Sequence, residues 1–197
     1  MQQKIIVGKC GIAMRKTVKG LSFIRLIPIL PWVNWQDDRF IMDLQRWRDI
    51  CKIEDSDRFV LAQLMWQYPE FRNLFIYRNR FRRAYRTWIK LWYKPMDTLY
   101  LQAKEIGGGL FIQHGFATMV TAESVGENCW INQQVTIGFN GGGSAPVIGN
   151  NVMITCGAKV LGSIMVGDNA VIGANAVVIR DVEPGAVMGG VPAKKIK

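Results

Sequence analysis

Every sixth residue across 148–178 is a β-branched aliphatic: Ile148, Ile154, Val160, Val166, Ile172 and Val178. An α-helix repeats every 3.6 residues and a β-strand every two, so a strict spacing of six is typical of neither. It indicates a solenoid of short strands and corners, in which each wall points one aliphatic side chain into a narrow core. Three such walls close one triangular coil of about 18 residues, and several coils must stack before a core is buried.

The same spacing is present earlier in the chain. It begins at Ile106 and Ile112, slips by one residue near Met119, and returns at Val125, Ile131 and Ile137. Residues 139–147 do not follow the six-residue spacing. The three consecutive glycines within them predict an external loop, a kind of segment that often carries function. We therefore expect residues 96–197 to form one mainly β domain with an external loop at 139–147.

Residues 1–95 have a different pattern, and we expect them to form a small α-helical N-terminal region. Glycines and prolines within residues 1–36 predict an irregular or extended start. Apolar residues at three- and four-residue spacing then predict helices over 37–51, 57–67 and 69–93. Pro69 suits the first position of the third helix, where its missing N–H costs nothing, and Pro95 ends that helix.

The third predicted helix carries both aromatic and basic side chains, among them Phe75, Tyr85, Trp88, Arg78 and Arg86. One interpretation is a peripheral contact with a membrane surface or an anionic glycan. The other and more ordinary interpretation is that the aromatic residues pack on the solenoid while the arginines face solvent. The formal net charge of +10 suits an acidic partner, and it equally suits solubility.

Cysteine and histidine usage limits the kinds of site that the chain can form. The cysteines are scattered without metal-binding spacing, so we expect free thiols in a reducing cytoplasm; they are Cys10, Cys51, Cys129 and Cys156. His114 is the only histidine, which excludes a histidine-cluster metal site within one chain, and we expect no metal. The apolar run at 21–35 contains Arg25 and two prolines and is too short to span a bilayer.

Four features together resemble the serine acetyltransferase-like branch of the hexapeptide-repeat O-acyltransferases: the sixes, IGGGLFIQHG at 106–115, INQQVTIG at 131–138 and GVPAK at 190–194. The resemblance covers about residues 96–197. It implies that the solenoid is a left-handed parallel β-helix, an exception to the usual right-handed crossover. It also implies a homotrimer, acetyl-CoA as the donor, and active sites in the grooves between neighbouring prisms.

His114 matches the catalytic histidine of that family. Its position agrees, because His114 lies two residues beyond the inward-pointing Ile112, at a corner, and is directed outward. An imidazole takes a proton from an alcohol near neutral pH and returns it to a leaving thiolate, as transfer from a thioester to a hydroxyl requires. A lone histidine is more often structural, but the corner position and the resemblance favour the catalytic role here.

Two positions depart from the family's pattern. The aspartate that orients the histidine in serine-specific members corresponds to Leu99, and a second histidine, in a loop, corresponds to Ala145. A backbone carbonyl, Glu105 or Glu123 would then orient the ring of His114. These losses favour the relatives that acetylate sugars in surface polysaccharides over a true L-serine acetyltransferase.

The resemblance also implies where the donor binds. Positions whose backbone meets the pantetheine arm of coenzyme A correspond to Cys156, Gly157 and Ala174. Cationic positions near the nucleotide phosphates correspond to Arg180 and Lys194, and Lys195 adds a further positive charge beside them. The alternative is ordinary corner geometry for the small residues and a solvated tail for the lysines. A covalent acyl-carrier role for the cysteine is disfavoured, because no second histidine exists to activate it.

Our hypothesis is an acetyl-CoA-dependent O-acetyltransferase in which His114 acts as general base on a hydroxyl acceptor. A backbone N–H, for example from Gly141, Gly142 or Gly143, would stabilise the oxyanion. A sugar or surface-polysaccharide precursor is the first acceptor and L-serine the alternative. A non-catalytic hexapeptide scaffold stays open. A metal-dependent hydratase would need histidines that this chain lacks. We expect no nucleic acid as partner, because no motif in the chain indicates recognition of bases.

Overall fold

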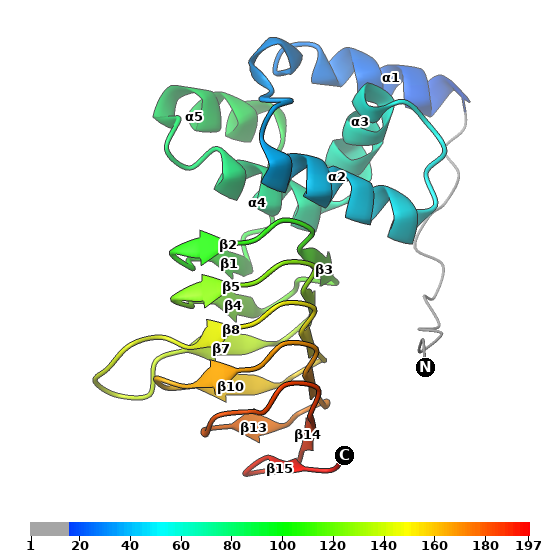
Figure 1. Ribbon diagram of the computed structural model, residues 1–197. Coiled ribbons are helices and arrows are strands. Elements are labelled where there is room, and N and C mark those ends of the chain that lie inside the picture. Colours follow the sequence, from blue (N-terminus) through cyan, green and yellow to red (C-terminus); the bar gives the residue numbers. More distant parts are fainter. Residues whose placement is uncertain (1–15) are drawn as a thin grey trace.

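The computed structural model describes residues 16–197 and places five α-helices before a three-sided prism of short β-strands (Figure 1). The helical elements are α1 (Lys16–Leu26), the short 3-10 helix η1 (Leu30–Trp32), α2 (Asp38–Cys51), α3 (Asp57–Gln67), α4 (Pro69–Arg78) and α5 (Arg83–Trp92). The prism is a left-handed parallel β-helix of about five coils, as expected. The helices cover its first coil, and the C-terminus lies at the opposite end (Figure 1).

Each wall of the prism is one sheet. Sheet A contains β1 (Leu99–Leu101), β4 (Thr118–Val120), β7 (Thr136–Gly138), β10 (Lys159–Leu161) and β13 (Val177–Val178). Sheet B contains β2 (Glu105–Ile106), β5 (Ser124–Val125), β8 (Val147–Ile148) and β11 (Met165–Val166). Sheet C contains β3 (Phe111–Gln113), β6 (Trp130–Asn132), β9 (Met153–Ile154), β12 (Val171–Ile172), β14 (Val187–Gly189) and β15 (Lys194–Lys195). The corners that join sheet C to sheet A form the C/A edge, and those that join sheet A to sheet B form the A/B edge.

The aliphatic residues at six-residue spacing point into the prism, as predicted. Ile131 pairs in register with Ile112 of the coil before it and with Ile154 of the coil after it, and Ile172 continues the row. All four residues are at most 1% exposed. Burying one such side chain contributes about 1.5–3 kcal/mol, so the repeated row supplies a continuous core along the prism axis.

The predicted slip of one residue near Met119 is wrong. Val120 is the inward residue, because it pairs with Ile137 and is fully buried, whereas Met119 is 41% exposed. The inward residues Ile112 and Val120 are therefore eight positions apart. Their partners in the next coil, Ile131 and Ile137, are six positions apart. The two additional residues lengthen the corner between β3 and β4, on the C/A edge.

Helices α2 and α3 form where the apolar spacing predicts them. The carboxylate of Asp37 caps α2 by accepting hydrogen bonds from the main-chain N–H groups of Arg39 and Phe40. The apolar side of α2 buries Phe40 and Trp47. Local capping and tertiary burial agree here, which is why the boundaries of this helix follow the sequence signals closely.

The expectation of an irregular start is wrong for residues 16–32. Lys16–Leu26 forms α1 and Leu30–Trp32 forms η1, while the part of the expectation that concerns residues 1–15 lies outside the described residues. The ring of Phe23 on α1 stacks on Phe59 of α3 with 4.5 Å between centroids. The two prolines that suggested irregular chain lie after α1, where they do not interrupt it. Packing against α3 therefore stabilises a helix that local sequence signals did not reveal.

A single helix over residues 69–93 is also wrong, because α4 ends at Arg78 and α5 begins at Arg83. The Asn79 side chain occupies the break: its Nδ2 donates to the carbonyl of Phe75 at 2.9 Å, and its Oδ1 accepts from Arg82 at 3.3 Å. Asparagine competes with the helical backbone for hydrogen bonds in this way. The break lets α5 turn away from the prism and pack beside α1 and η1 (Figure 1).

Two arginines of this segment bond to other helices, whereas the more ordinary interpretation of the helix has them facing solvent. Arg72 donates to the carbonyls of Met65 and Trp66 at the end of α3, at 2.6 and 2.5 Å. Arg78 is 3% exposed at its side chain and forms a bidentate pair with Asp43 of α2 at 2.7 and 3.0 Å. These contacts join helices to one another instead of facing water.

The Arg78–Asp43 pair connects the helices to the first coil. Arg78 Nη2 donates to the carbonyl of Gly107 at 2.6 Å, and Asp43 Oδ1 accepts from the N–H of Gly109 at 2.8 Å and of Leu110 at 3.2 Å. Burial raises the pKa of Asp43 to about 6, although the guanidinium and the two N–H groups lower it. The carboxylate is therefore ionised at neutral pH, and both charges have partners inside the joint.

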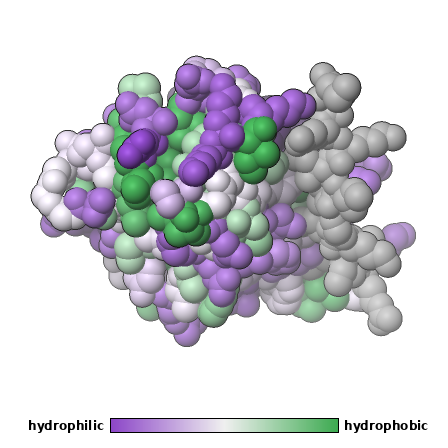
Figure 2. Space-filling model, turned by 90° about the horizontal axis from the view of Figure 1, so that it is seen from below, coloured by the Kyte–Doolittle hydropathy of each residue, from purple (hydrophilic) through white to green (hydrophobic). Residues whose placement is uncertain are grey.

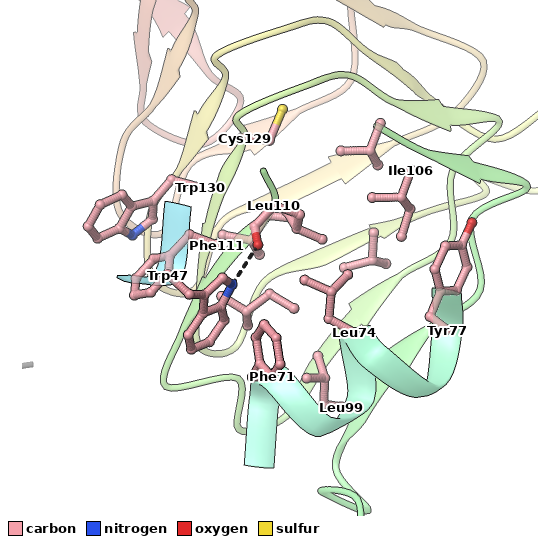
Figure 3. Close-up of a cluster of buried hydrophobic side chains, with 14 of the residues drawn as sticks. Trp47, Phe71, Leu74, Tyr77, Leu99, Ile106, Leu110, Phe111, Cys129 and Trp130 are labelled. Atoms are coloured by element: carbon pink, nitrogen blue, oxygen red, sulfur yellow. Dashed lines mark hydrogen bonds between the residues drawn. The ribbon is translucent and has the colours of Figure 1, made fainter. Parts of the chain in front are cut away.

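Aromatic packing closes the same joint (Figure 3). Trp47 of α2 donates its indole N–H to the carbonyl of Leu110 at 2.9 Å. Its ring contacts Phe111 with 4.5 Å between centroids, and Phe111 in turn contacts Trp130 of the next coil at 4.6 Å. Phe71 of α4 completes the cluster. The helices and the prism thus share one hydrophobic core.

The other end of the prism is closed by β15, which pairs antiparallel with β14. Seen from this end, hydrophobic side chains lie among hydrophilic ones (Figure 2), and Val191 and Ile196 are exposed. Within residues 16–197, no helix is both long and apolar enough to cross a membrane.

Candidate active site

The C/A edge brings together the predicted base and three of the predicted donor-site residues. His114 lies at the corner after β3, Cys156 and Gly157 lie at the corner after β9, and Ala174 lies at the corner after β12. Sheet C passes into sheet A at each of these corners. Residues that are 60 positions apart in the chain, His114 and Ala174, therefore share one edge.

Main-chain hydrogen bonds stack these corners. The N–H of Gly157 donates to the carbonyl of Gln133 at 3.0 Å, and the N–H of Asn175 donates to the carbonyl of Cys156 at 2.9 Å. Neighbouring coils lie about 4.8 Å apart, so the corner of His114 is separated from that of Cys156 by about 10 Å along the edge. That distance suits an extended thioester-bearing arm lying along the edge.

His114 occupies the lengthened corner with its side chain exposed. Its φ of 54° is left-handed, a conformation that is uncommon for residues other than Gly and that Asn, Asp and His adopt most readily among the rest. The carbonyl of His114 accepts a hydrogen bond from the N–H of Phe116 at 2.6 Å, which closes the turn. No group within residues 16–197 forms a hydrogen bond with the imidazole. The ring is thus presented to solvent on a constrained backbone, as a general base for an incoming substrate must be.

Glu70 of α4 holds this corner from the other side. Its Oε1 accepts a hydrogen bond from the N–H of Gly115 at 3.2 Å, and the residue is 9% exposed. A Cβ on Gly115 would lie 3.0 Å from side-chain atoms of Ile112 and Leu99 and 3.1 Å from Glu70, so only glycine fits without displacement. Leu99, where the family resemblance places an aspartate, packs under the corner as an apolar support.

Sequence reasoning missed Glu70 and named two other carboxylates. Glu105 lies in β2 of sheet B, and Glu123, just before β5, forms an ion pair with Lys104. Neither residue lies at the C/A edge, so the expectation that one of them orients His114 is not supported by their placement. Glu70 was overlooked because an acidic residue in the first turn of a helix is expected there for its interaction with the helix dipole alone.

The donor-site residues have the backbone geometry of tight corners. Gly157 has a φ of 73°, and a Cβ there would lie 2.0 Å from the side-chain oxygen of Asn175. Cys156 is partly accessible and Ala174 is exposed. Small side chains at these corners let a ligand approach the main chain closely, which suits an amide-rich arm.

Gln133 is a second residue that sequence reasoning did not single out. It lies on the C/A edge one coil beyond His114 and one coil before Cys156. Its side-chain Oε1 is buried and has no hydrogen-bond partner among the described residues. An unpaired buried amide oxygen is costly, and its place between the base and the donor corners makes it a candidate substrate contact.

The basic residues predicted for the nucleotide phosphates do not gather on this edge. Arg180 follows β13 and lies on the A/B edge, on the far side of sheet A. Lys194 and Lys195 form β15 at the end of the prism, and Lys195 pairs with Glu183 at 2.6 Å. Lys194 follows Ala193, whose N–H bonds to the carbonyl of Val177 at 2.8 Å, so Lys194 lies near the end of the C/A edge.

The glycine loop at 139–147 leaves the prism at the A/B edge and projects away from it (Figure 1). Gly141, Gly142 and Gly143 are exposed, whereas Ala145 at its base is buried. Sheet A separates the loop from His114 of the same chain, so these N–H groups cannot serve that histidine within one prism. Residues 16–197 contain no group of three or more His, Cys, Asp or Glu side chains placed to hold a metal ion.

Comparison with known proteins agrees with this architecture. The family model described as bacterial transferase hexapeptide (six repeats) matches residues 145–180. The chain is 42% identical to the serine acetyltransferase of Synechococcus elongatus over 95 residues, which are 46% of this chain and 39% of that relative. It is 44% identical to the serine acetyltransferase of Helicobacter pylori over 96 residues, which are 47% of this chain and 56% of that relative. The chain thus spans about half the length of these curated relatives, or less.

Solved structures extend the likeness to the helices. A serine acetyltransferase in complex with cysteine is 27% identical, with a TM-score of 0.63 over 90% of this chain and 74% of that one. The Neisseria gonorrhoeae serine acetyltransferase is 26% identical, with a TM-score of 0.61 over 96% of this chain and 78% of that one. These matches confirm the resemblance to the serine acetyltransferase-like, hexapeptide-repeat acyltransferases.

Proposed function

We propose that this protein is an acetyl-CoA-dependent O-acetyltransferase whose acceptor is L-serine. The observation that carries the proposal is the C/A edge, which sets an exposed imidazole and two small-residue donor corners in one line. The names of the relatives support serine more strongly than the sugar acceptor that the sequence alone favoured. The departures at Leu99 and Ala145 keep a sugar hydroxyl as the second acceptor to test.

The chemistry needs one proton carrier. The imidazole of His114 takes the proton from the acceptor hydroxyl, and the oxygen attacks the carbonyl carbon of the thioester. The tetrahedral oxyanion then collapses, the C–S bond breaks, and the imidazolium returns its proton to the leaving thiolate. The acetyl ester and the free thiol of coenzyme A are the products. Glu70 fixes the Gly115 peptide and so positions the neighbouring base, without touching the reacting atoms.

We further propose that the working unit is a homotrimer, as the family resemblance implies. The loop at 139–147 and Arg180 both lie on the A/B edge, where they are remote from His114 of their own chain. Side-by-side packing of prisms would bring the A/B edge of one chain toward the C/A edge of the next. The loop N–H groups and Arg180 would then complete the neighbour's site, with the N–H groups at the oxyanion and Arg180 at the phosphates of the donor.

A substitution at His114 tests the proposal without disturbing the corner. Asparagine tolerates the left-handed φ of 54° at this position, so His114→Asn removes the base and keeps the turn. The matched control is Asn151→Asp, because Asn151 is exposed with a φ of 55° at a corner between sheets B and C, away from the C/A edge. Free thiol is followed after mixing purified protein and acetyl-CoA with L-serine, and separately with a panel of monosaccharides.

We expect thiol release with L-serine, normal rates for Asn151→Asp, and a fall of about 10²–10⁴-fold in kcat for His114→Asn, the usual contribution of a general base. Thiol release with a monosaccharide but not with L-serine would identify a sugar as the acceptor. Full turnover by His114→Asn would remove the histidine from the mechanism. Binding of acetyl-CoA without transfer to any acceptor would favour the non-catalytic scaffold.

A further inference from the structure

The segment that contains α1 and η1 is fastened to α5 by side chains that bond to main-chain carbonyls. Tyr85 and Trp88 of α5 donate to the carbonyls of Ile29 and Pro28, at 2.8 and 2.9 Å. In the opposite direction, Arg25 of α1 donates to the carbonyl of Trp92 through two nitrogens, at 2.5 and 3.1 Å. The two helices therefore form one rigid platform at the end of the molecule opposite β15 (Figure 1).

The outer side of this platform is apolar and exposed. We call it the apolar face, and it consists of Leu21, Ile24, Ile27, Trp32, Trp88, Leu91 and Trp92. Ile24 of α1 is 62% exposed and Leu91 of α5 is 74% exposed. A groove between the two helices is lined by residues of this face. Scattered exposed apolar residues need no explanation, but a contiguous apolar face built on two helices marks an interaction surface.

The two segments that carry the apolar face have charge of one sign. Residues 16–32 contain three basic and no acidic residues, and residues 80–94 contain six basic and no acidic residues. Arg25 lines the groove of the face and Arg82 donates to the carbonyl of Trp32 at 2.7 Å, whereas Arg80, Arg86 and Lys90 line a separate cavity beside β1. Only two of the nine have acidic partners within residues 16–197, as Lys19 pairs with Asp55 and Lys94 pairs with Asp97. The surface is therefore complementary to an extended negative charge and not to a mixed one.

We propose that the apolar face docks on the surface of an anionic lipid bilayer. Aliphatic side chains flanked by lysine and arginine match the boundary between acyl chains and headgroups. Three tryptophans, Trp32, Trp88 and Trp92, belong to the face, and tryptophan is the residue enriched at that boundary. Each lysine or arginine near an anionic surface adds to the attraction. A protein partner would more often supply both signs of charge along a rim of this size.

The position of the apolar face suits such a contact. It lies on the helical end of the molecule, so the prism and its C/A edge would extend away from the bilayer and stay accessible to water (Figure 1). The homotrimer of the proposed function would present three apolar faces toward the same side, because the prisms would run parallel. Three weak contacts held together bind far more tightly than one.

Sedimentation with vesicles tests the proposal. The full chain is mixed with vesicles of phosphatidylcholine alone, and with vesicles that contain equal parts of phosphatidylcholine and phosphatidylglycerol. We expect binding to the mixed vesicles, little binding to phosphatidylcholine, and partial release by salt. The variant Ile24→Gln/Leu91→Gln removes apolar contact without a change of charge, and we expect it to bind the mixed vesicles at least tenfold more weakly. Met165→Gln on β11 is its control, because Met165 is similarly exposed on the prism.

Charge reversal at two places distinguishes attraction by the local surface from attraction by the net charge of the whole protein. Lys16→Glu/Arg83→Glu and Lys52→Glu/Arg58→Glu change the net charge equally, and all four residues are exposed. Only the first variant should lose binding, by at least tenfold, while circular dichroism and the melting temperature of each variant report folding. Equal loss in both variants, equal binding to both kinds of vesicle, or no binding would overturn the proposal. A concentration-dependent mass doubling that Ile24→Gln/Leu91→Gln abolishes would assign the face to a second copy instead.

Discussion

The side chain of Glu70 accepts a hydrogen bond from the main-chain N–H of Gly115 at 3.2 Å, so a helix that precedes the prism holds the corner next to His114. The corner is two residues longer than its counterpart in the following coil, and length of this kind normally brings freedom of movement. The buried carboxylate removes that freedom from one side of the turn. The helical region therefore contributes to the candidate site as well as to the core.

Replacing Glu70 by alanine should lower kcat for thiol release about tenfold, with a smaller effect on the KM for acetyl-CoA. The reason is that the Gly115 N–H loses its acceptor, which costs about 1–3 kcal/mol for a buried donor, and the base next to it is no longer held in place. Glu70→Gln should restore most of kcat, because its amide oxygen accepts the same hydrogen bond. A drop in melting temperature with unchanged kcat would show that Glu70 is only structural. Glu54→Ala, an exposed glutamate of the helical region, is the control.

Asp43→Ala should destabilise the fold by about 3–5 kcal/mol, because it leaves the charge of Arg78 buried without its partner. It also removes the acceptor of two main-chain N–H groups in the first coil. Urea unfolding followed by circular dichroism measures the loss. Asp49→Ala, an exposed position on the same helix, should change stability by no more than about 0.5 kcal/mol. Similar effects for the two variants would mean that the buried pair contributes little.

Cys156 should be protected from alkylation by the donor. Its side chain is partly accessible on the C/A edge, and the proposed pantetheine arm would lie over it. At pH 8, iodoacetamide modification of the peptide that contains Cys156 should slow several-fold when coenzyme A is added, as measured by mass spectrometry. L-serine alone should give no protection. An unchanged rate with saturating coenzyme A would place the donor elsewhere on the prism.

Cys129 should make stability fall in alkaline solution. Burial raises the pKa of its thiol from 9.0 to about 11, and the thiol donates to the carbonyl of Gly149 at 3.1 Å. Between these values the native state keeps the proton that the unfolded chain has lost, so the contribution of the thiol is fully present below pH 9 and is lost as the pH rises toward 11. The stability advantage over Cys129→Ala should therefore shrink by about 2 kcal/mol across that range. Denaturant unfolding at several pH values measures it, and a pH-independent difference would contradict the shift.

The prism could be predicted because the same six-residue spacing of aliphatic side chains recurs along the chain. Each inward position must be filled by an aliphatic side chain of similar size, so Ile154, Val160, Val166 and Ile172 stand six residues apart in the chain, and Ile154 and Ile172 pair in register in the structure. The prediction of which residue points inward was wrong only near Met119, where both Met119 and Val120 are apolar. Spacing alone cannot tell which of two adjacent apolar residues points inward when a corner has gained length.

The helices and the supports of the site were harder to predict because they depend on contacts between distant residues. Helix α1 is stabilised by packing on α3, and Arg78 at the end of α4 is held by Asp43 from another helix. Glu70 becomes a support of the His114 corner only when α4 lies against the first coil. The corner positions of His114, Cys156 and Ala174 followed from the repeat, whereas their neighbours across elements did not.

The reversed direction of β15 determines how copies of this chain can associate. Met188 and Gly189 of β14 pair with Lys195 and Lys194, so the outermost parallel strand of sheet C has no vacant row of N–H and C=O groups to offer. A second prism cannot pair with β14 from below, and the edge left at this end of sheet C is that of β15, which is only two residues long. A short edge strand is a poor template for strand addition, so this end of the prism disfavours end-to-end growth.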